Sequence, residues 1–438
     1  MKIHLKFCIA AKTCIVLFML VMITTVSNAQ LKNYDGIKFP TKFYPILPWN
    51  NVDSGDSLKD IADCNFNTVF ILRPNDIHRV EKLGLKAIMY MDFHVKPDIN
   101  NLRLFRNLTD QEIENKVINL ISITGNSKAI IGYFLMDEPS ALDFHALGVA
   151  VAAIKKYARG KLIYINLLPN YATLSKLNQI NSQLGTKTYT EYLERYINEV
   201  KPQFISYDNY MVPFSMNLKD KESASSYYTN LLEIRQISLK YNLPCWNTVC
   251  SNQIRKNTPI PTLHSLLFQA YTSLAAGYNG ILWYTYLHTG YDYCPIDKNK
   301  NKTATWYSLQ EVNRQISSLG SLMNQLVSTG VYFTSPAPDE SLPLLPGNVV
   351  ESVNSDGPMM IGEFVNDIGK RYVMIVNLSL DHSVKFAFSS KIAQGNTWVI
   401  SMNKDKYQMP KMKKRDMSNY KSGYLLKAGE GVLIKAGE

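Results

Sequence analysis

Cysteine is scarce in this chain of 438 residues, which carries six Cys. Two of them lie in the first 29 residues, and the other four are too few to form a disulfide framework. Cys245 and Cys250 lie on one extended segment, so their backbones are too far apart to pair with each other. No Cys/His spacing typical of zinc ligands occurs. The sequence implies neither a metal nor an organic cofactor.

Glycine-rich phosphate loops are also missing. No Gly-x-Gly-x-x-Gly follows the first predicted strand, and no P-loop occurs anywhere. These absences argue against the usual nucleotide ligands of open α/β sheets.

Long apolar runs are missing except at the N-terminus. There, Lys2, Lys6 and Lys12 precede an apolar run over 14–26, and Ser27-Asn28-Ala29 supplies small residues for cleavage. We therefore predict a signal peptide over 1–29, a periplasmic or secreted protein and no stable membrane span after cleavage. An N-terminal anchor that is not cleaved is the alternative.

Acidic residues are outnumbered, because 47 Lys and Arg face 36 Asp and Glu. Removing the signal peptide lowers the formal charge from +11 to +8. Such a surface favours an anionic partner, such as an acidic glycan. The basic cluster at 411–415 lacks a recognisable nucleic-acid-binding module around it, so no nucleic-acid partner is expected.

What the chain does contain is a repeating unit of a short apolar strand, a polar turn and an amphipathic helix. The expected strands are 43–48, 68–72, 87–91, 130–135, 162–166, 204–207, 244–249 and 280–284. Apolar strands that alternate with helices are typical of a parallel sheet covered on both faces. Eight such units predict a (β/α)8 TIM barrel, which we assign to residues 30–330.

A proline-rich stretch follows this region and indicates a domain boundary; its prolines are Pro336, Pro338, Pro343 and Pro346. Beyond them come short alternating strands, expected at 359–364, 372–377, 384–387, 397–401 and 431–435. This pattern predicts a small antiparallel β-sandwich over 331–438.

The active site of a (β/α)8 barrel lies at the carboxyl ends of its strands. Polar and aromatic side chains crowd these positions, which is typical of a sugar-binding cup. The residues that we expect to contact a carbohydrate are Trp49, Asp92, His94, Asn166, Asn170, Asn209, Tyr210, Trp246, Asn247, Trp283, Tyr284, Tyr286 and Asp292.

Glu138, in Met136-Asp137-Glu138-Pro139, is the single glutamate at a predicted strand end. A glycosidic oxygen needs a proton as its bond breaks, and a partly buried Glu with a raised pKa supplies it near neutral pH. The structural alternative is an acid that interacts with the dipole of the following helix. We predict that Glu138 is the proton donor.

The segment Gly-Tyr-Phe-Leu-Met-Asp-Glu-Pro at 132–139 resembles the fourth-strand signature of clan A glycoside hydrolases, and of family 42-like bacterial β-galactosidases in particular. Segments 206–210 and 269–286 are also similar to that group, and 431–434 resembles the end of its C-terminal β-domain. The resemblance implies a carbohydrate substrate, with Glu138 as the acid/base.

Two departures leave the second carboxylate open. Asp137 stands where clan A enzymes typically carry Asn, and the predicted seventh strand, with Cys250 after it, holds no acid. Asp208 is the first choice, as nucleophile or as base depending on its separation from Glu138. Asp137 is another candidate for the second carboxylate, since substrate-assisted enzymes for N-acetylated sugars also use an Asp-Glu pair. Asp292 is the third candidate. A catalytically decayed barrel that binds glycans without turnover is the alternative function.

Overall fold

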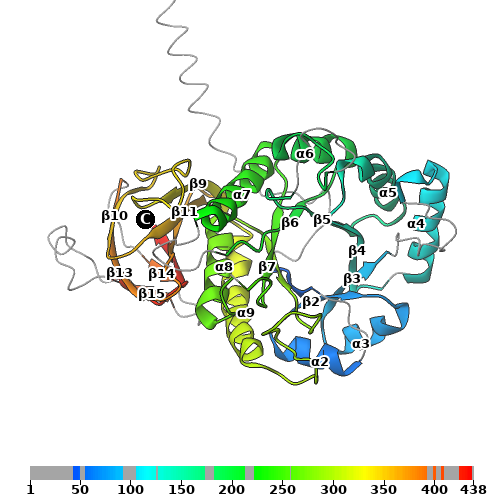
Figure 1. Ribbon diagram of the computed structural model, residues 1–438, viewed down its shortest axis with the longest axis horizontal. Helices are drawn as coiled ribbons and strands as arrows, with labels where there is room; N and C mark the ends of the chain where they lie inside the picture. The colour runs from blue at the N-terminus through cyan, green and yellow to red at the C-terminus, as the bar shows by residue number, and fades with distance from the viewer. Residues whose placement is uncertain are drawn as a thin grey trace, which may run out of the picture.

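The computed structural model describes residues 43–49, 55–91, 105–124, 127–172, 182–212, 221–256, 258–391, 398–400, 406–408 and 424–436. It has two parts, a ring of strands surrounded by helices and a smaller β-structure beside it (Figure 1). The predicted signal peptide, Asp92, His94 and the cluster at 411–415 lie outside the described residues. Within the described ranges, no helix is both long and apolar enough to cross a membrane.

The ring consists of eight parallel strands that run in the order β1-β8-β7-β6-β5-β4-β3-β2. The backbone N–H of Asn67 donates to the carbonyl of Ile46 at 3.2 Å, which brings β2 back to β1. The predicted TIM barrel is therefore confirmed. Its strands are β1 (Ile46–Pro48), β2 (Thr68–Ile71), β3 (Lys86–Tyr90), β4 (Ile130–Asp137), β5 (Leu162–Leu167), β6 (Ile205–Asp208), β7 (Cys245–Cys250) and β8 (Gly280–Tyr284).

Helices form the outer layer around the strands, as Figure 1 shows. They are α2 (Gly55–Asp63), α3 (Ile77–Lys82), α4 (Asp110–Thr124), α5 (Phe144–Tyr157), α6 (Tyr189–Arg195), α7 (Lys221–Lys240), α8 (Leu263–Ala275) and α9 (Ala304–Met323). Short turns η1 (Pro74–Asp76), η2 (Phe105–Asn107) and η3 (Ala141–Asp143) precede helices, and α6 continues as a π-helix, η5 (Tyr196–Val200).

Strand side chains alternate between two apolar cores, as a pleated strand requires. One set, which includes Leu47, Phe70 and Tyr164, fills the interior of the barrel. The other set, which includes Ile46, Val69 and Ile163, packs under the surrounding helices. The barrel is thus a packed core, and the carboxyl ends of its strands are where barrels of this kind bind ligands.

The smaller part is an antiparallel sandwich of a six-stranded sheet, β15-β14-β17-β12-β11-β9, and a three-stranded sheet, β10-β13-β16. This confirms the predicted fold, although the sequence pattern does not predict β9, β10, β15 or β16. The strands are β9 (Val327–Phe333), β10 (Val350–Ser355), β11 (Met359–Val365), β12 (Arg371–Asn377), β13 (Val384–Ser390), β14 (Trp398–Ile400), β15 (Lys406–Gln408), β16 (Tyr424–Leu426) and β17 (Gly431–Ala436).

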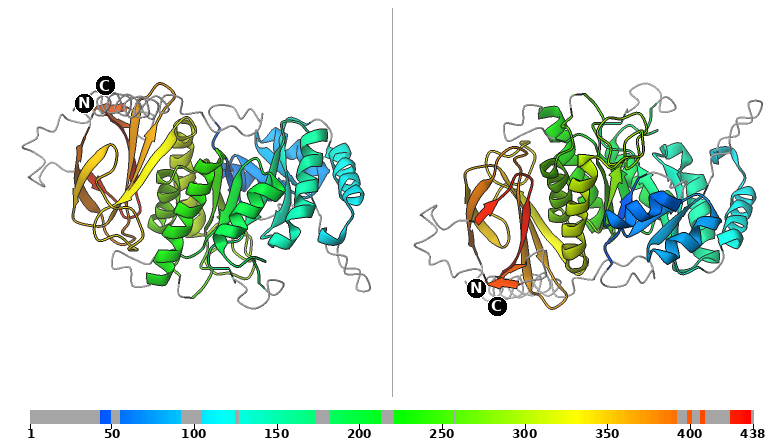
Figure 2. Two further views of the ribbon diagram at one scale, coloured as in Figure 1. Left: turned by 90° about the horizontal axis from the view of Figure 1, so that it is seen from above. Right: turned by 90° about the horizontal axis from the view of Figure 1, so that it is seen from below.

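The six-stranded sheet packs on the barrel through α8 (Figure 2). On β11, Met359 and Ile361 point into the sandwich core, whereas Met360 and Phe364 join the core that lies under the barrel helices. Gly362 lies between them, and a Cβ at this position would overlap with the backbone carbonyl of Ala275 on α8. The close approach of the strand to the helix therefore requires glycine at 362.

Candidate active site

The end of β4 is bent by a bulge that changes the direction of its side chains. The pairing with β5 shifts between Phe134 and Met136. Phe134 faces the barrel interior, while Leu135 and Met136 both lie in the outer core. The extra residue turns Asp137 back toward the interior, where it contacts β5. Bulges next to active sites commonly re-aim a side chain in this way.

Glu138 follows the bulge in the left-handed region of backbone space, with φ 45°. This conformation is uncommon for a residue with a side chain, and such strain tends to concentrate at functional sites. The Glu138 N–H donates to the carbonyl of Asn166 at 2.8 Å. Beyond Pro139, Ser140 and Asp143 form a capping box that starts the next helical segment. The backbone on both sides of Glu138 is thus held in place.

Asn166, on β5, connects two acids that come from different strands. Its Nδ2 donates to Oδ1 of Asp137 at 3.2 Å and to Oδ2 of Asp208 at 3.1 Å. Its Oδ1 accepts from the hydroxyls of Ser206 at 3.1 Å, Thr248 at 3.2 Å and Tyr164 at 3.3 Å. Since Asn166 is completely buried, it is a structural bridge and is not available to a substrate hydroxyl.

Asp208, at the end of β6, is 3% exposed. Its Oδ2 accepts from Asn166 and from the hydroxyl of Tyr210, the latter at 3.1 Å. Its Oδ1 is buried and has no hydrogen-bond donor among the described residues. Asp208 and Glu138 also interact with each other, and a hydrogen bond between two carboxyl groups requires a proton on one of them.

Burial raises the pKa of all three carboxyls. Desolvation in the barrel mouth, with the nearby Glu138 charge, raises the pKa of Asp137 to about 7. Desolvation also raises the pKa of Glu138, and a hydrogen bond from Asp208 works in the opposite direction. The pKa of Asp208 lies well above its ordinary value because of its burial and then because of the Glu138 and Asp137 charges. The cluster therefore retains protons near neutral pH.

Accessibility separates the three acids. The side chains of Asp137 and Glu138 remain open to solvent, although protein atoms surround them closely enough to desolvate them. Asp208 is covered. A ligand in the barrel mouth would therefore touch the adjacent pair at the end of β4.

Aromatic rings line the mouth beside the acids. Tyr210 and Tyr284 are stacked, with centroids 5.0 Å apart and an angle of 28°. Trp49 lies 6.4 Å from Tyr284 and packs edge-on against Phe70 and Phe134 at the top of the interior core. These three of the predicted contact residues are half-buried, so each keeps part of its ring accessible. Such a wall suits stacking on a sugar ring.

Three other aromatic residues are not at the mouth, and the expectation that they contact a carbohydrate needs correction. Trp246 is completely buried in the interior core, 4.5 Å from Phe204. Trp283 is also completely buried and donates to Asn313 of α9. Tyr286 is 1% exposed and accepts from Trp306 of the same helix. Trp246 is the second residue of β7, whereas Trp283 lies near the carboxyl end of β8 and Tyr286 follows that strand. The face of the strand and the level along the barrel axis place each of the three rings in a core.

Three predicted contact amides connect the barrel to its helices. Asn170 binds α7, with Nδ2 3.2 Å from Glu233, and Asn209 donates to Asn230 on the same helix at 3.0 Å. Asn247 is 1% exposed and donates to Ser273 of α8 at 2.9 Å. The three amides therefore hold barrel strands and loops against α7 and α8.

Asp292 is exposed in the loop after β8, where its backbone carbonyl accepts from Gln253 at 3.1 Å. The structure adds Tyr171, whose hydroxyl accepts the backbone N–H of Tyr210 at 3.4 Å. It also adds Thr248 of β7, whose hydroxyl donates to Asn166. Position after the fifth strand could have indicated Tyr171, whereas nothing in the sequence distinguishes Thr248.

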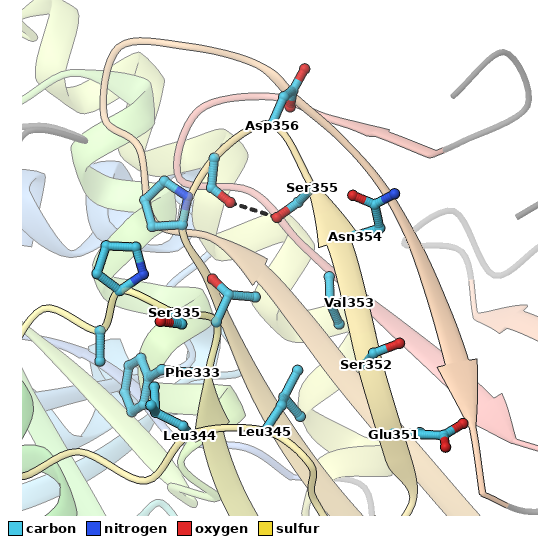
Figure 3. A pocket seen from close by; sticks show the side chains of 15 residues that line it. Phe333, Ser335, Leu344, Leu345, Glu351, Ser352, Val353, Asn354, Ser355 and Asp356 are labelled. Atoms are coloured by element: carbon cyan, nitrogen blue, oxygen red, sulfur yellow. Dashed lines mark hydrogen bonds between the residues drawn. The ribbon is translucent and has the colours of Figure 1, made fainter. Parts of the chain in front are cut away.

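A second hollow lies on the sandwich, far along the chain from the acids. It is a groove of about 660 Å³ with Phe333, Leu344 and Leu345 among its lining residues and polar side chains along β10. Figure 3 shows Glu351 and Asp356 at opposite ends of this row. The groove therefore lacks the adjacent carboxyl pair that distinguishes the barrel mouth.

Comparisons with known proteins show the fold. No protein-family model matches the chain, and no curated protein matches it by sequence. One similar solved structure is titled "Glycoside hydrolase", with 13% identity, a TM-score of 0.55 and coverage of 90% of this chain and 93% of that one. A glycoside hydrolase family 5 structure from Bacteroides vulgatus ATCC 8482 has the same identity and TM-score, with 90% of both chains covered. At 13% identity these likenesses show the fold, a (β/α)8 barrel followed by a β-domain, and they do not support family 42 specifically.

Proposed function

We propose that this protein is an exported glycoside hydrolase and that Glu138 protonates the leaving oxygen. The observation that carries the proposal is the pair of accessible, adjacent carboxyls at the end of β4, backed by a third, buried carboxyl. Proton donation near neutral pH needs a carboxyl with a raised pKa, and burial raises that of Glu138. The fold shared with glycoside hydrolases is consistent with this chemistry.

Asp137 is the second carboxyl that a substrate could reach. With a pKa of about 7, it is partly ionised at neutral pH. In that form it can stabilise developing positive charge or orient a polar group of the sugar. The aromatic wall of Trp49, Tyr210 and Tyr284 would hold the ring beside the two acids.

The substrate is proposed to be a poly- or oligosaccharide, and the surplus of basic residues favours an acidic one. Export rests on the charge, apolar run and small residues of the first 29 positions. N-terminal sequencing of the protein recovered outside the cytoplasm tests it, with Gln30 expected as the first residue.

The decisive experiment measures hydrolysis of aryl glycosides and of plant, microbial and host glycans by the purified mature protein. Glu138→Gln should lower kcat by a factor of about 10² or more, because amide cannot donate the proton. Glu351→Gln, an exposed substitution in the sandwich groove, is the matched control and should leave kcat unchanged. Turnover that survives Glu138→Gln would contradict the proposal.

A glycan-binding barrel without turnover is the second candidate. The observation that favours it is β7, Cys-Trp-Asn-Thr-Val-Cys over Cys245–Cys250, which carries no acid. Binding to a glycan array, unaffected by Glu138→Gln and accompanied by no hydrolysis, would support this function.

A further inference from the structure

Asp208 cannot act on a substrate directly in the arrangement seen here. A nucleophile or a general base must touch the sugar carbon or a water next to it. At 3% exposure, Asp208 lies beneath the accessible pair of Asp137 and Glu138. Whatever Asp208 contributes must pass through its neighbours.

The orientation of the Asp208 carboxyl is fixed on one side. Oδ2 receives two hydrogen bonds, from Asn166 and from Tyr210. Asn166 is itself fixed, since its Oδ1 accepts from three hydroxyls. The remaining oxygen, Oδ1, is directed away from these donors and has none of its own among the described residues.

An ionised Asp208 would therefore place a buried oxygen anion without a donor beside a second carboxyl. Burying a charge without a partner is costly. A proton on Oδ1 removes the charge and provides a donor for the Glu138 carboxylate. The same hydrogen bond then satisfies both groups.

We propose that Asp208 is a positioning residue that retains a proton on Oδ1 and donates it in a hydrogen bond to Glu138, and that it is neither nucleophile nor base. The proposal rests on the function proposed above. When Glu138 passes its proton to the leaving oxygen, the carboxylate that remains accepts the hydrogen bond from Asp208. No bond forms between Asp208 and the sugar, and Glu138 regains its proton from solvent.

The groups around Asp208 reinforce this assignment. After burial, the largest influences on the pKa of Asp208 come from Glu138, Asp137 and Tyr210, and none of these is a cation. The nearby cation Arg255 lies over the ring of Tyr171, 5.6 Å from its centroid. The charge of Asp208 in turn raises the pKa of four tyrosines on other elements, Tyr164, Tyr171, Tyr189 and Tyr284.

Asp208→Asn is a close mimic of the protonated carboxyl. Its amide oxygen can accept from Asn166 and Tyr210, and its NH2 group can donate to Glu138 in place of the Oδ1 proton. We expect kcat to fall by less than about tenfold, with the alkaline limb of the pH–rate profile unchanged. A loss of about 10³-fold or more would overturn the proposal, because it would indicate a nucleophile or base.

Asp208→Leu tests the opposite change, because leucine cannot donate a hydrogen bond to Glu138. Glu138 then loses a hydrogen bond to its ionised form, its pKa rises, and the alkaline limb should move to higher pH. An unshifted limb in Asp208→Leu would contradict the proposal. Circular dichroism and thermal unfolding identify the conditions under which Asp208→Leu is folded. If Asp208→Leu does not fold, the kcat and pH–rate profile of Asp208→Asn test the proposal.

Infrared titration tests the proton without any turnover. Carboxylic acid and carboxylate groups have separate stretching bands. We would follow both bands from about pH 4 to about pH 9, a range that covers ordinary and raised carboxyl pKa values. Because Asp137 and Glu138 also have raised pKa values, we expect the protonated band of the wild-type protein to persist above the ordinary range and to lose the Asp208 part of its intensity in Asp208→Asn. If Asp208→Asn leaves that band intact, the assignment fails. Because this readout needs no substrate, its failure is distinct from the failure of the proposed glycosidase activity.

Discussion

Two buried acids, one in each part of the molecule, have opposite environments. Glu363, on β11 of the sandwich, is completely buried. Its Oε1 accepts the N–H groups of Val349 and Val350 at 2.8 Å each, and its Oε2 accepts the N–H of Asn348 at 2.9 Å. Asp208, in the barrel, is nearly as buried, yet one of its oxygens has no donor among the described residues and two other acids act on it.

The difference shows that burial alone does not identify a functional acid. A buried carboxylate with three backbone donors is a structural element, because its charge is compensated by the chain that it holds together. A buried carboxyl beside other carboxyls is destabilising by itself, and such groups are maintained at sites where protonation does chemical work. The number of hydrogen-bond donors to a buried carboxyl, more than its degree of burial, therefore distinguishes a structural acid from a functional one.

The largest effect on stability should come from the sandwich. Glu363→Ala leaves three backbone N–H groups buried without an acceptor, so we expect unfolding to become easier by about 3 kcal/mol or more. Denaturant unfolding measures the loss, with exposed Glu340→Ala as the control. The activity of the folded fraction should not change, and a selective loss of kcat would break the distinction between the two acids.

A smaller effect is expected where the two parts meet. Gly362→Ala places a methyl group against the carbonyl of Ala275, and overpacking of this kind costs about 1–3 kcal/mol. Thermal unfolding should show the loss, while Val365→Ala on the same strand tests ordinary truncation at a half-buried position. An unchanged melting temperature in Gly362→Ala would show that the contact yields easily.

The smallest effect concerns pH and the barrel acid. The native pKa of Asp208 is raised, so between its unfolded and native pKa values the native state binds more protons and stability falls as pH rises. Asp208→Asn removes this penalty, and its melting temperature should exceed that of the wild type more at about pH 8 than at about pH 5. For a gain of about 1 kcal/mol the difference is a few degrees. An equal difference at both pH values would show that Asp208 titrates normally.

The barrel could be predicted because its signal is local and repeated. Strands such as β2 and β8 are short apolar runs between polar turns, and the structure has them within a residue of the expected positions. The sandwich was predicted from the same kind of pattern, although the pattern did not predict β9, β10, β15 or β16. β10 has only one fully buried residue, Val350, so its apolar alternation is weak.

The residues of the mouth were harder to predict. Trp246 and Tyr284 both lie on barrel strands, but the first fills the interior and the second faces the mouth. Sequence position specifies the strand, whereas the level along the barrel axis and the face depend on the register between strands. That register is set by packing among segments far apart in the chain.

The sequence by itself determined that eight strand–helix units form a barrel, and that Glu138 follows the fourth strand. Apolar periodicity and strand order depend on neighbours along the chain, so both can be read directly. Only the tertiary structure decided that Asp137 turns inward, that Asn166 connects it to Asp208 and that Asp208 is covered. These features depend on a bulge in β4 and on hydrogen bonds between β4, β5 and β6, contacts that exist only once the barrel has closed.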